Sequence, residues 1–349
     1  MEDLTGKVFG AYKIIAPLGE GGMAAVYKAY QPAMERFVAV KVLPRKFAES
    51  PEFISRFQRE AIMLAQLQHP HILPVFDYGQ AEGYSYIVMP FLQNGTLAEL
   101  FLIRRRTLPE VGQIMTQVGS ALGYAHARGM IHRDVKPSNV LIDEQGNCLL
   151  TDFGLARMVE MSSASLTSAG AIMGTPAYMS PEQGKGAAVD GRSDLYSLGI
   201  MFYEMLTGQV PYHDEYPMGV VIKHIRDPLP SARELVPNLS DAIENVLIKS
   251  LAKDPTDRYQ TADDFIQAVQ NALSVNPPGG KAVSRVLDSV YDRLLVKKKA
   301  GQKDGESSGR ISDPAFSAGE KTVISQPPST PIDDEIDPAT PPSDKPISD

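Results

Sequence analysis

A short run of polar residues between positions 131 and 139 combines side chains that could carry out group-transfer chemistry. Asp134 could accept a proton from a hydroxyl group. Asn139 could bind a metal ion through its amide oxygen, and Lys136 could neutralise an anionic group during its transfer. Asp152, which is followed by Phe and Gly, adds a hard carboxylate oxygen that suits Mg²⁺. Each short string would mean little alone, but the two in this order are specific.

Glycine residues cluster upstream, at Gly19, Gly21 and Gly22, between two predicted strands. Glycine lets a backbone approach phosphate groups closely because no Cβ atom intrudes. Ala24 stands where the third glycine of a Gly-x-Gly-x-x-Gly pattern would fall, and the Gly-Lys-Ser/Thr of a Walker A loop is missing. An ordinary hairpin turn is therefore the alternative interpretation of this segment.

A lysine lies within an apolar predicted strand, where Val38, Ala39 and Val40 precede Lys41. A lysine in such a strand is costly unless it has a partner. Glu60, in the next predicted helix, could pair with Lys41 and orient its ammonium group toward an anion. A surface lysine and a solvated helical glutamate are the alternative.

The elements that must position these residues change type along the chain. Short β-compatible runs separated by Gly, Gln or Pro predict strands over Tyr12–Pro17, Val26–Ala29, Phe37–Val42, Leu73–Tyr78 and Tyr84–Met89. Helical spacing of apolar residues predicts helices over Pro51–Leu67, Pro109–Arg128, Asp194–Thr207, Asp241–Ala252 and Thr261–Leu273. A sheet-rich part is therefore followed by a helix-rich part.

Composition limits the classes of protein to consider. The chain has 349 residues, is 43% hydrophobic and carries a net charge of -8, which does not suit nucleic-acid binding. Residues 300–349 hold 10 acidic and 4 basic residues, so most of the negative charge belongs to this tail. The single cysteine, Cys148, lies in a predicted strand and indicates a reducing compartment. The N-terminus does not resemble a signal peptide, and no apolar run is long enough to span a bilayer.

A strong breaker ends the helix-rich part at 276–280, where Asn, two Pro and two Gly residues follow one another. An apolar stripe predicts one amphipathic helix over 281–299. From residue 300 the chain is rich in Pro, Ser, Asp and Gly and is predicted to be disordered. The predicted divisions are a domain over 1–275, a linker and helix over 276–299, and an acidic tail over 300–349.

With these motifs in order, the chain resembles the eukaryotic-type protein kinases, and closely their bacterial serine/threonine branch, over about residues 10–275. The segment from Gly174 to Glu182, with its Ser-Pro-Glu, completes the motif set. The resemblance implies a bilobal α+β fold. A small N-lobe, about residues 10–90, would hold an antiparallel β-sheet and one helix. A larger, mainly helical C-lobe would cover about residues 91–275.

The resemblance also implies roles for the residues of the motifs. Lys41 would contact the α- and β-phosphates of ATP, and Glu60 would hold Lys41. Asp152 and Asn139 would bind Mg²⁺, with Mn²⁺ as a second candidate metal. Asp134 would orient the acceptor hydroxyl and take its proton. A lysine two residues after that aspartate, here at position 136, is typical of serine/threonine kinases.

An adenine pocket is the next implication of the resemblance. Its predicted ATP-binding residues, besides Lys41, are Leu18, Gly19, Gly21, Gly22, Val26, Ala39, Met89, Pro90, Leu92 and Leu141. Met89 would be the gatekeeper, and the hinge would use the carbonyl of Pro90 and the N–H of Leu92. Plain core packing is the alternative for the apolar members.

The resemblance further implies regulation by phosphorylation. Arg133 would bind a phosphorylated residue of the activation loop, with Thr167 as the first candidate and Ser168 as the second. Thr175 would belong to the substrate-binding loop. Three residues are assigned structural roles: Asp194, and Glu182 paired with Arg258. A polar loop without a switch is the alternative for the two candidate phosphosites.

These implications predict a serine/threonine protein kinase that transfers the γ-phosphoryl group of MgATP to proteins and activates itself by autophosphorylation. A pseudokinase scaffold is the alternative, although the residues that such proteins lose are present. Small-molecule kinases lack the 174–182 segment. Expected partners are protein substrates, phosphothreonine-binding domains and a second copy of the chain, without nucleic acid or a membrane span. The expected location is the cytoplasm, with a membrane anchor only if the natural protein continues beyond Asp349.

Overall fold

The computed structural model describes residues 2–20, 24–43, 51–103, 106–153 and 176–274. The strands are β1 (Val8–Phe9), β2 (Tyr12–Glu20), β3 (Ala25–Gln31), β4 (Arg36–Val42), β5 (Asp77–Ala81), β6 (Tyr84–Pro90), β7 (Val140–Ile142) and β8 (Cys148–Leu150). The helices are α2 (Pro51–Ala65), α3 (Leu97–Ile103), α4 (Leu108–His126), α6 (Pro181–Gly184), α7 (Gly191–Thr207), α8 (Pro217–Arg226), α9 (Ala232–Leu235), α10 (Asp241–Ser250) and α11 (Ala262–Ser274).

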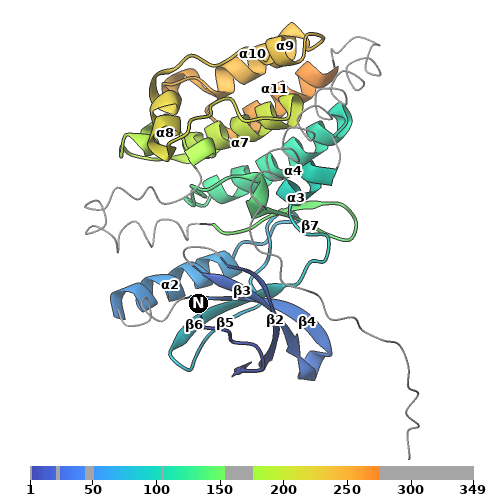
Figure 1. Ribbon diagram of the computed structural model, residues 1–349, viewed down its shortest axis with the longest axis vertical. Helices are drawn as coiled ribbons and strands as arrows, with labels where there is room; N and C mark the ends of the chain where they lie inside the picture. The colour runs from blue at the N-terminus through green and yellow to red at the C-terminus, as the bar shows by residue number, and fades with distance from the viewer. Residues whose placement is uncertain (1, 21–23, 44–50, 104–105, 154–175, 275–349) are drawn as a thin grey trace, which may run out of the picture. The chain divides into compact units, whose positions relative to one another are not determined.

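The first lobe is an antiparallel sheet with the strand order β1-β2-β3-β4-β6-β5. Side chains alternate between its two faces with a period of two. Val38, Val40 and Val42 of β4 therefore enter one apolar cluster, while Ala39 enters a second cluster on the other face. That second cluster includes Phe57 of α2, which packs against the sheet (Figure 1). The alternation turns Lys41 toward the same face as Ala39.

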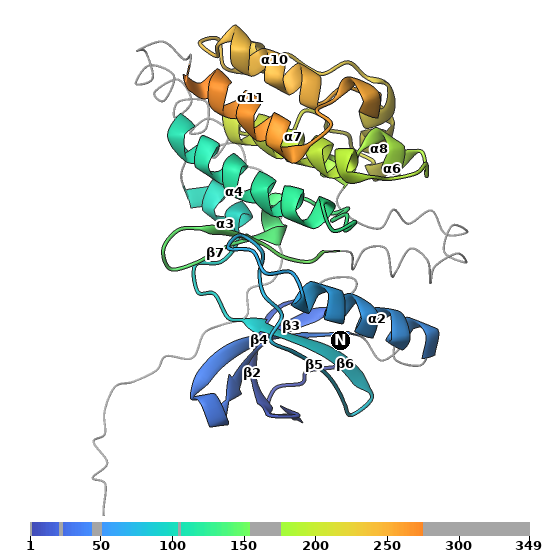
Figure 2. The same ribbon diagram turned by 180° about the vertical axis from the view of Figure 1, so that it is seen from behind.

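The second lobe is built around one large core of helices. Its members come from α4, α7, α10 and α11, with β7 and β8 at one edge. α11 packs against α4 and α10, and Figure 2 shows it lying between them. α4 begins with a capping box formed by Thr107 and Glu110, and α7 begins at an Asp190 cap and ends at Gly208, whose φ is 83°. These caps explain why both helices begin earlier than their apolar patterns predict.

The hairpin of β7 and β8 connects the helical core to the segment between α2 and β5. Val140 pairs with Leu150 within the hairpin, and a single bridge joins Leu150 to Ile72. Cys148 lies buried in β8, as predicted, and burial raises the pKa of its thiol to about 12. The loops on either side of the hairpin carry the candidate catalytic residues.

The bilobal α+β architecture is confirmed, but individual elements differ from their predictions. The predicted strand over Leu73–Tyr78 is wrong: β5 covers Asp77–Ala81, because Pro74 cannot donate a ladder hydrogen bond. The sequence patterns do not predict β1, β7, α3, α6, α8 or α9. The other predicted helices agree with the structure to within three residues at each end. The predicted helix over 281–299 and the acidic tail lie outside the described residues, so the predicted domain divisions stay predictions.

Candidate active site

A buried carboxylate of α7 holds the loop between α4 and β7. The Asp194 side chain is 1% exposed, and its oxygens accept the backbone N–H groups of His132 at 2.8 Å and Arg133 at 2.7 Å. The Nε2 atom of His126, at the end of α4, lies 2.8 Å from the same carboxylate. Arg133 has a φ of 69°, a conformation that a non-glycine residue keeps only when its surroundings impose it. These contacts fix the backbone just before Asp134 and so orient the Asp134 side chain.

The imidazole of His132 joins this loop to the segment after β8. Its Nε2 atom lies 2.8 Å from the carbonyl oxygen of Thr151, and its Nδ1 atom accepts the N–H of Asp134 at 3.2 Å. Because Nδ1 accepts, the ring hydrogen is on Nε2 and donates to Thr151. The ring also packs against Phe153, with the centroids 4.6 Å apart. The two segments that carry Asp134 and Asp152 are therefore fixed to each other.

Asp134, Lys136 and Asn139 form one connected group. The Nζ atom of Lys136 lies 2.7 Å from Oδ2 of Asp134. The amide nitrogen of Asn139 donates to the same Oδ2 atom at 2.9 Å and to the carbonyl oxygen of Asp134 at 2.8 Å. Since the nitrogen of Asn139 is committed to Asp134, its amide oxygen is left to accept a hydrogen bond or to bind a cation.

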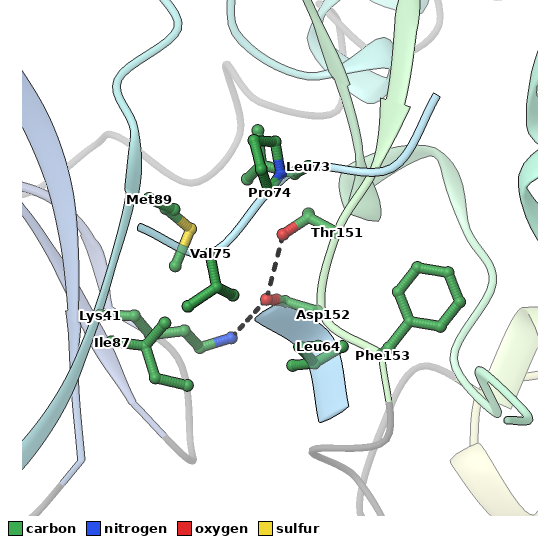
Figure 3. Close-up of a pocket in the computed structure, with 10 residues that line it drawn as sticks. All are labelled: Lys41, Leu64, Leu73, Pro74, Val75, Ile87, Met89, Thr151, Asp152 and Phe153. Carbon is green, nitrogen blue, oxygen red and sulfur yellow. Dashed lines mark hydrogen bonds and ion pairs between the residues drawn. The ribbon is translucent and has the colours of Figure 1, made fainter. Parts of the chain in front are cut away.

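Lys41 and Asp152 bring the two lobes together at the site. The Nζ atom of Lys41 lies 2.7 Å from Oδ1 of Asp152, and Figure 3 shows this contact beside Thr151. Burial alone would raise the pKa of Asp152. The charge and hydrogen bond of Lys41, together with the charge of Lys136, outweigh it and hold that pKa below its usual value. Asp152 is therefore ionised at neutral pH and attracts cations.

A pocket lies beside this ion pair, between the sheet and the segment that follows β8 (Figure 3). Its lining residues are Lys41, Leu64, Leu73, Pro74, Val75, Ile87, Met89, Thr151, Asp152 and Phe153. Only Lys41, Met89 and Asp152 were among the predicted site residues. Ile87 lies two residues before Met89 in the same strand, so the period of two could have identified it. No sequence signal distinguishes the other apolar lining residues from core residues.

The predicted adenine-pocket residues converge in part. One apolar cluster contains Val26, Ala39, Met89, Leu92 and Leu141. Ala39 lies opposite Met89 in the register of β4 and β6. Leu18, on β2, is 47% exposed and is not among the described members of this cluster. Gly19 lies opposite Val26, and Pro90 ends β6.

Glu182 of α6 and Arg258 form a buried ion pair. Both guanidinium Nη atoms donate to the carboxylate, each at 2.8 Å, and the hydroxyl of Ser193 donates to it as well. Arg258 also donates to the carbonyl oxygens of Ala252 and Lys253. Burial would raise the pKa of Glu182, but the bonds from Arg258 and Ser193 lower it below its usual value. The pair therefore fixes the segment around α6 to the helical core.

Comparison with known proteins agrees with this geometry. The family model described as "Protein kinase domain" matches residues 12–271. The chain belongs to the protein kinase family. Its bilobal architecture is the protein kinase fold.

Several proteins similar to this chain are bacterial kinases. Serine/threonine-protein kinase PrkC of Bacillus subtilis (strain 168) is 37% identical over 313 residues, which cover 87% of this chain and 48% of PrkC. Serine/threonine-protein kinase PknB of Mycobacterium tuberculosis is 38% identical over 301 residues, covering 84% of this chain and 47% of PknB. The crystal structure of the Mycobacterium tuberculosis PknI kinase domain is 31% identical, has a TM-score of 0.61, and covers 78% of this chain and 100% of that chain. The chain thus spans about half the length of the curated relatives it matches.

Protein kinases use ATP and a divalent metal ion, and the donors present here fit such an ion. A small hard cation is usually held by one or two protein oxygens together with phosphate groups and water. Asp152 supplies an ionised carboxylate and Asn139 an uncommitted amide oxygen. Within the described ranges, no group of three or more His, Cys, Asp or Glu side chains could form an all-protein metal site. The donor set therefore suits a metal that arrives with a nucleotide.

Several predicted site residues lie outside the described residues, namely Gly21, Gly22, Thr167, Ser168 and Thr175. The backbone of Glu60 lies in α2, but its side chain is not described, so its pairing with Lys41 stays a prediction. Among the helices of the described ranges, none is long and apolar enough to cross a membrane.

Proposed function

We propose that this chain transfers the γ-phosphoryl group of MgATP to serine and threonine hydroxyls of proteins. The observation that carries the proposal is the connected group of Asp134, Lys136 and Asn139, together with the Lys41–Asp152 ion pair. The charge of Lys136 also acts on Asp152, so the two groups share one electrostatic environment. The similar bacterial proteins named as serine/threonine-protein kinases support the same reaction.

Each residue of the group has one task. Asp134 orients the acceptor hydroxyl and takes up its proton as the new P–O bond forms and the bond to the ADP oxygen breaks. Lys136 compensates the charge of the transferring group. Asn139 and Asp152 hold the metal ion, Mg²⁺ or alternatively Mn²⁺, which when bound neutralises phosphate charge. Positioning and charge compensation thus supply most of the catalysis.

ATP binding uses both lobes. The apolar cluster that contains Val26, Ala39, Met89, Leu92 and Leu141 receives the adenine, and Leu18 covers it from β2. The carbonyl of Pro90 and the N–H of Leu92 contact its polar edge. Gly19, Gly21 and Gly22 approach the phosphates, and Lys41 contacts them while Glu60 holds Lys41 in place.

Regulation follows from a guanidinium group beside the catalytic aspartate. Arg133 binds a phosphate group on Thr167, or on Ser168 as the second candidate, and this orders the activation loop. Thr175 contacts the substrate. Autophosphorylation on the loop therefore switches the kinase on.

The remaining partners and the location are part of the same proposal. The kinase acts in the cytoplasm, which its single buried cysteine supports, and it pairs with a second copy. Phosphorylated threonines of the tail recruit phosphothreonine-binding domains. A pseudokinase scaffold, which would bind partners without turnover, is the rival function.

The experiment that tests the proposal compares the wild type with Asp134→Asn after incubation with MgATP or MnATP. Intact mass and phosphosite mapping should show phosphate added to the wild type at Thr167 or Ser168, and to an added protein substrate. Asp134→Asn should lose at least about a hundredfold of this activity, because it removes the proton acceptor. ATP binding without any transfer by the wild type would instead favour the scaffold.

A further inference from the structure

The short helix α6 begins with a reciprocal cap formed by Ser180 and Gln183. The Oγ atom of Ser180 accepts the N–H of Gln183 at 3.4 Å. In return, the Oε1 atom of Gln183 accepts the backbone N–H and the hydroxyl of Ser180, each at 3.0 Å. This capping box satisfies N–H groups that the start of a helix leaves free.

The same side-chain amide reaches a second segment. The Nε2 atom of Gln183 donates to the carbonyl oxygen of Arg133 at 2.8 Å. The opposite amide orientation would place NH₂ against the N–H of Ser180 and a carbonyl against the carbonyl of Arg133, so the network fixes the orientation. One side chain therefore caps α6 with its oxygen and holds the catalytic loop with its nitrogen.

The contact falls on the peptide bond that joins Arg133 to Asp134. Gln183 binds the carbonyl oxygen of this peptide, and Nδ1 of His132 accepts its N–H at 3.2 Å. Arg133 itself is held in the left-handed region, with a φ of 69°, while Asp194 accepts its N–H. With both polar atoms bound, the peptide plane cannot rotate without breaking a hydrogen bond. That plane sets the direction of the Asp134 side chain.

Contacts with other elements hold α6 in place, so its hydrogen bond to the loop can fix the position of the loop. Glu182 is bound bidentately by Arg258. Gly184 approaches α8 so closely that an added Cβ atom would lie 2.7 Å from Cγ1 of Val221. Just before α6, the carbonyl oxygen of Tyr178 accepts the hydroxyl of Ser197 at 2.7 Å.

We propose that Gln183 is a positioning residue that orients the peptide before Asp134 and thereby couples the 176–184 segment to the proton-accepting carboxylate. Its catalytic consequence rests on the function proposed above, whereas the coupling between the two segments does not. Because the 176–184 segment follows the activation loop in the chain, its placement is transmitted to the aspartate through the side-chain amide of Gln183.

Three variants separate the two contacts of Gln183. Gln183→Glu keeps an oxygen for Ser180 but turns a second oxygen toward the carbonyl of Arg133, so it removes the donor. Gln183→Met removes both contacts without adding charge, and Ser180→Ala removes the cap while leaving the donor. Thr107→Ala is the matched control, since it removes the equivalent capping box of α4.

Amide hydrogen exchange measures the coupling in the full chain, with or without catalysis. Over residues 131–136, Gln183→Glu and Gln183→Met should exchange about tenfold faster than the wild type, because the peptide loses one of its two anchors. Ser180→Ala should change exchange there less than either variant, and Thr107→Ala should not change it. If residues 131–136 exchanged at the wild-type rate in both Gln183 variants, the coupling would be overturned, whether or not the protein transfers phosphate.

Steady-state kinetics measure the consequence of this coupling for phosphate transfer. The kcat for a protein acceptor should fall about tenfold in both Gln183 variants, while the KM for ATP stays within about twofold. The reason is that the side-chain hydrogen bonds of Gln183 within the described residues go to Ser180 and Arg133, outside the sheet. Thr107→Ala should keep the wild-type kcat. Faster exchange with an unchanged kcat, or a rise in the ATP KM equal to the fall in kcat, would overturn the positioning role. A wild type that transfers no phosphate would contradict the proposed function instead, and exchange would still decide the coupling.

Discussion

Two ion pairs near the site differ in how much water reaches them. The side chains of Lys41 and Asp152 are 13% and 30% exposed, whereas those of Arg258 and Glu182 are 0% and 8% exposed. A pair that water reaches can exchange partners at low cost. A buried pair cannot, because removal of one partner leaves an uncompensated charge. Lys41 is therefore suited to transfer its contact from Asp152 to a phosphate group, and Arg258 to keep its contact permanently.

This difference predicts the effect of removing Arg258. Arg258→Leu should lower the free energy of unfolding by about 3–5 kcal/mol, because Glu182 would remain buried without its partner. Arg233→Leu is the control: Arg233 pairs with Asp241 at the surface, so its loss should cost less than about 1 kcal/mol. Urea unfolding of both variants measures the difference. Equal, small losses would mean that the buried pair contributes no more than a surface pair.

At the scale of single residues, the sequence identifies the candidate catalytic residues better than it identifies the residues that contact them. Asp134 and Asn139 are recognisable from their spacing, and the structure joins them by hydrogen bonds. The contact of Gln183 with Arg133 could not be predicted, because its two ends lie fifty positions apart in the chain. A capping box can be read from local spacing, but a tertiary hydrogen bond needs the fold.

Among the elements, α8 is held against α7 by a buried histidine. The Nδ1 atom of His224 lies 2.9 Å from the hydroxyl of Tyr196, and its ring packs on Tyr212 with centroids 4.8 Å apart. The ammonium of Lys253 donates to the carbonyl oxygen of His224 at 2.7 Å. Burial, followed by the charge of Lys253, lowers the pKa of His224 from 6.5 to about 4. The folded chain therefore favours a neutral imidazole at this contact.

The preference for a neutral His224 imidazole predicts that the free energy of unfolding falls in acid. Between pH 6.5 and about 4 the unfolded chain binds a proton at His224 that the folded chain does not, so stability falls as the pH falls through this window. From pH 7 to pH 5 this one residue should remove about 2 kcal/mol. His224→Gln has no imidazole to protonate, so it does not lose this stability in acid. The difference in free energy of unfolding between the wild type and His224→Gln should therefore be smaller at pH 5 than at pH 7 by the same amount.

Urea unfolding of the wild type and His224→Gln at pH 7 and pH 5 tests the prediction. All other titratable groups are common to the two proteins, so their contributions cancel in the difference. If the difference in free energy of unfolding between the two proteins were the same at both pH values, His224 would have the same pKa in the folded and unfolded chains, which contradicts the prediction.

Long periodic elements could be predicted from the sequence, and short ones could not. α4, α7 and α11 have apolar patterns over three or more turns, so periodicity identifies them. β1 has two residues and α6 has four, too few for any period to appear. Pro217 at the start of α8 was a usable signal that the apolar pattern alone did not provide.

For the molecule as a whole, the site depends on both lobes folding. Lys41 and Met89 come from β4 and β6 of the sheet, while Asp134, Asn139 and Asp152 come from the segments on either side of β7 and β8. The order of the motifs predicted this arrangement only through resemblance to a family, because spacing along the chain does not specify how two lobes face each other. The ion pair between Lys41 and Asp152 is the contact that spacing alone could not predict.

The helical core is closed by α11, which sets the minimum length of a folded chain. Phe265 and Val269 are buried in that core, and α11 packs so closely on α4 that a Cβ atom on Gly119 would lie 2.7 Å from Ile266. Burial of each large apolar side chain contributes about 1.5–3 kcal/mol, and a typical domain is stable by only about 5–15 kcal/mol. Loss of α11 alone should therefore unfold the helical lobe.

A chain ending at Val275 should keep a single cooperative thermal transition within a few degrees of the full chain, because α11 is complete at Ser274. A chain ending at Thr261 should have no cooperative transition, since the core would lose Phe265 and Val269 and expose α4. Circular dichroism during heating distinguishes the two. If the chain ending at Val275 also failed to unfold cooperatively, residues 276–349 would contribute to the folded domain, and the predicted boundary at residue 275 would be wrong. If the chain ending at Thr261 kept its transition, the helical core would be stable without its closing helix.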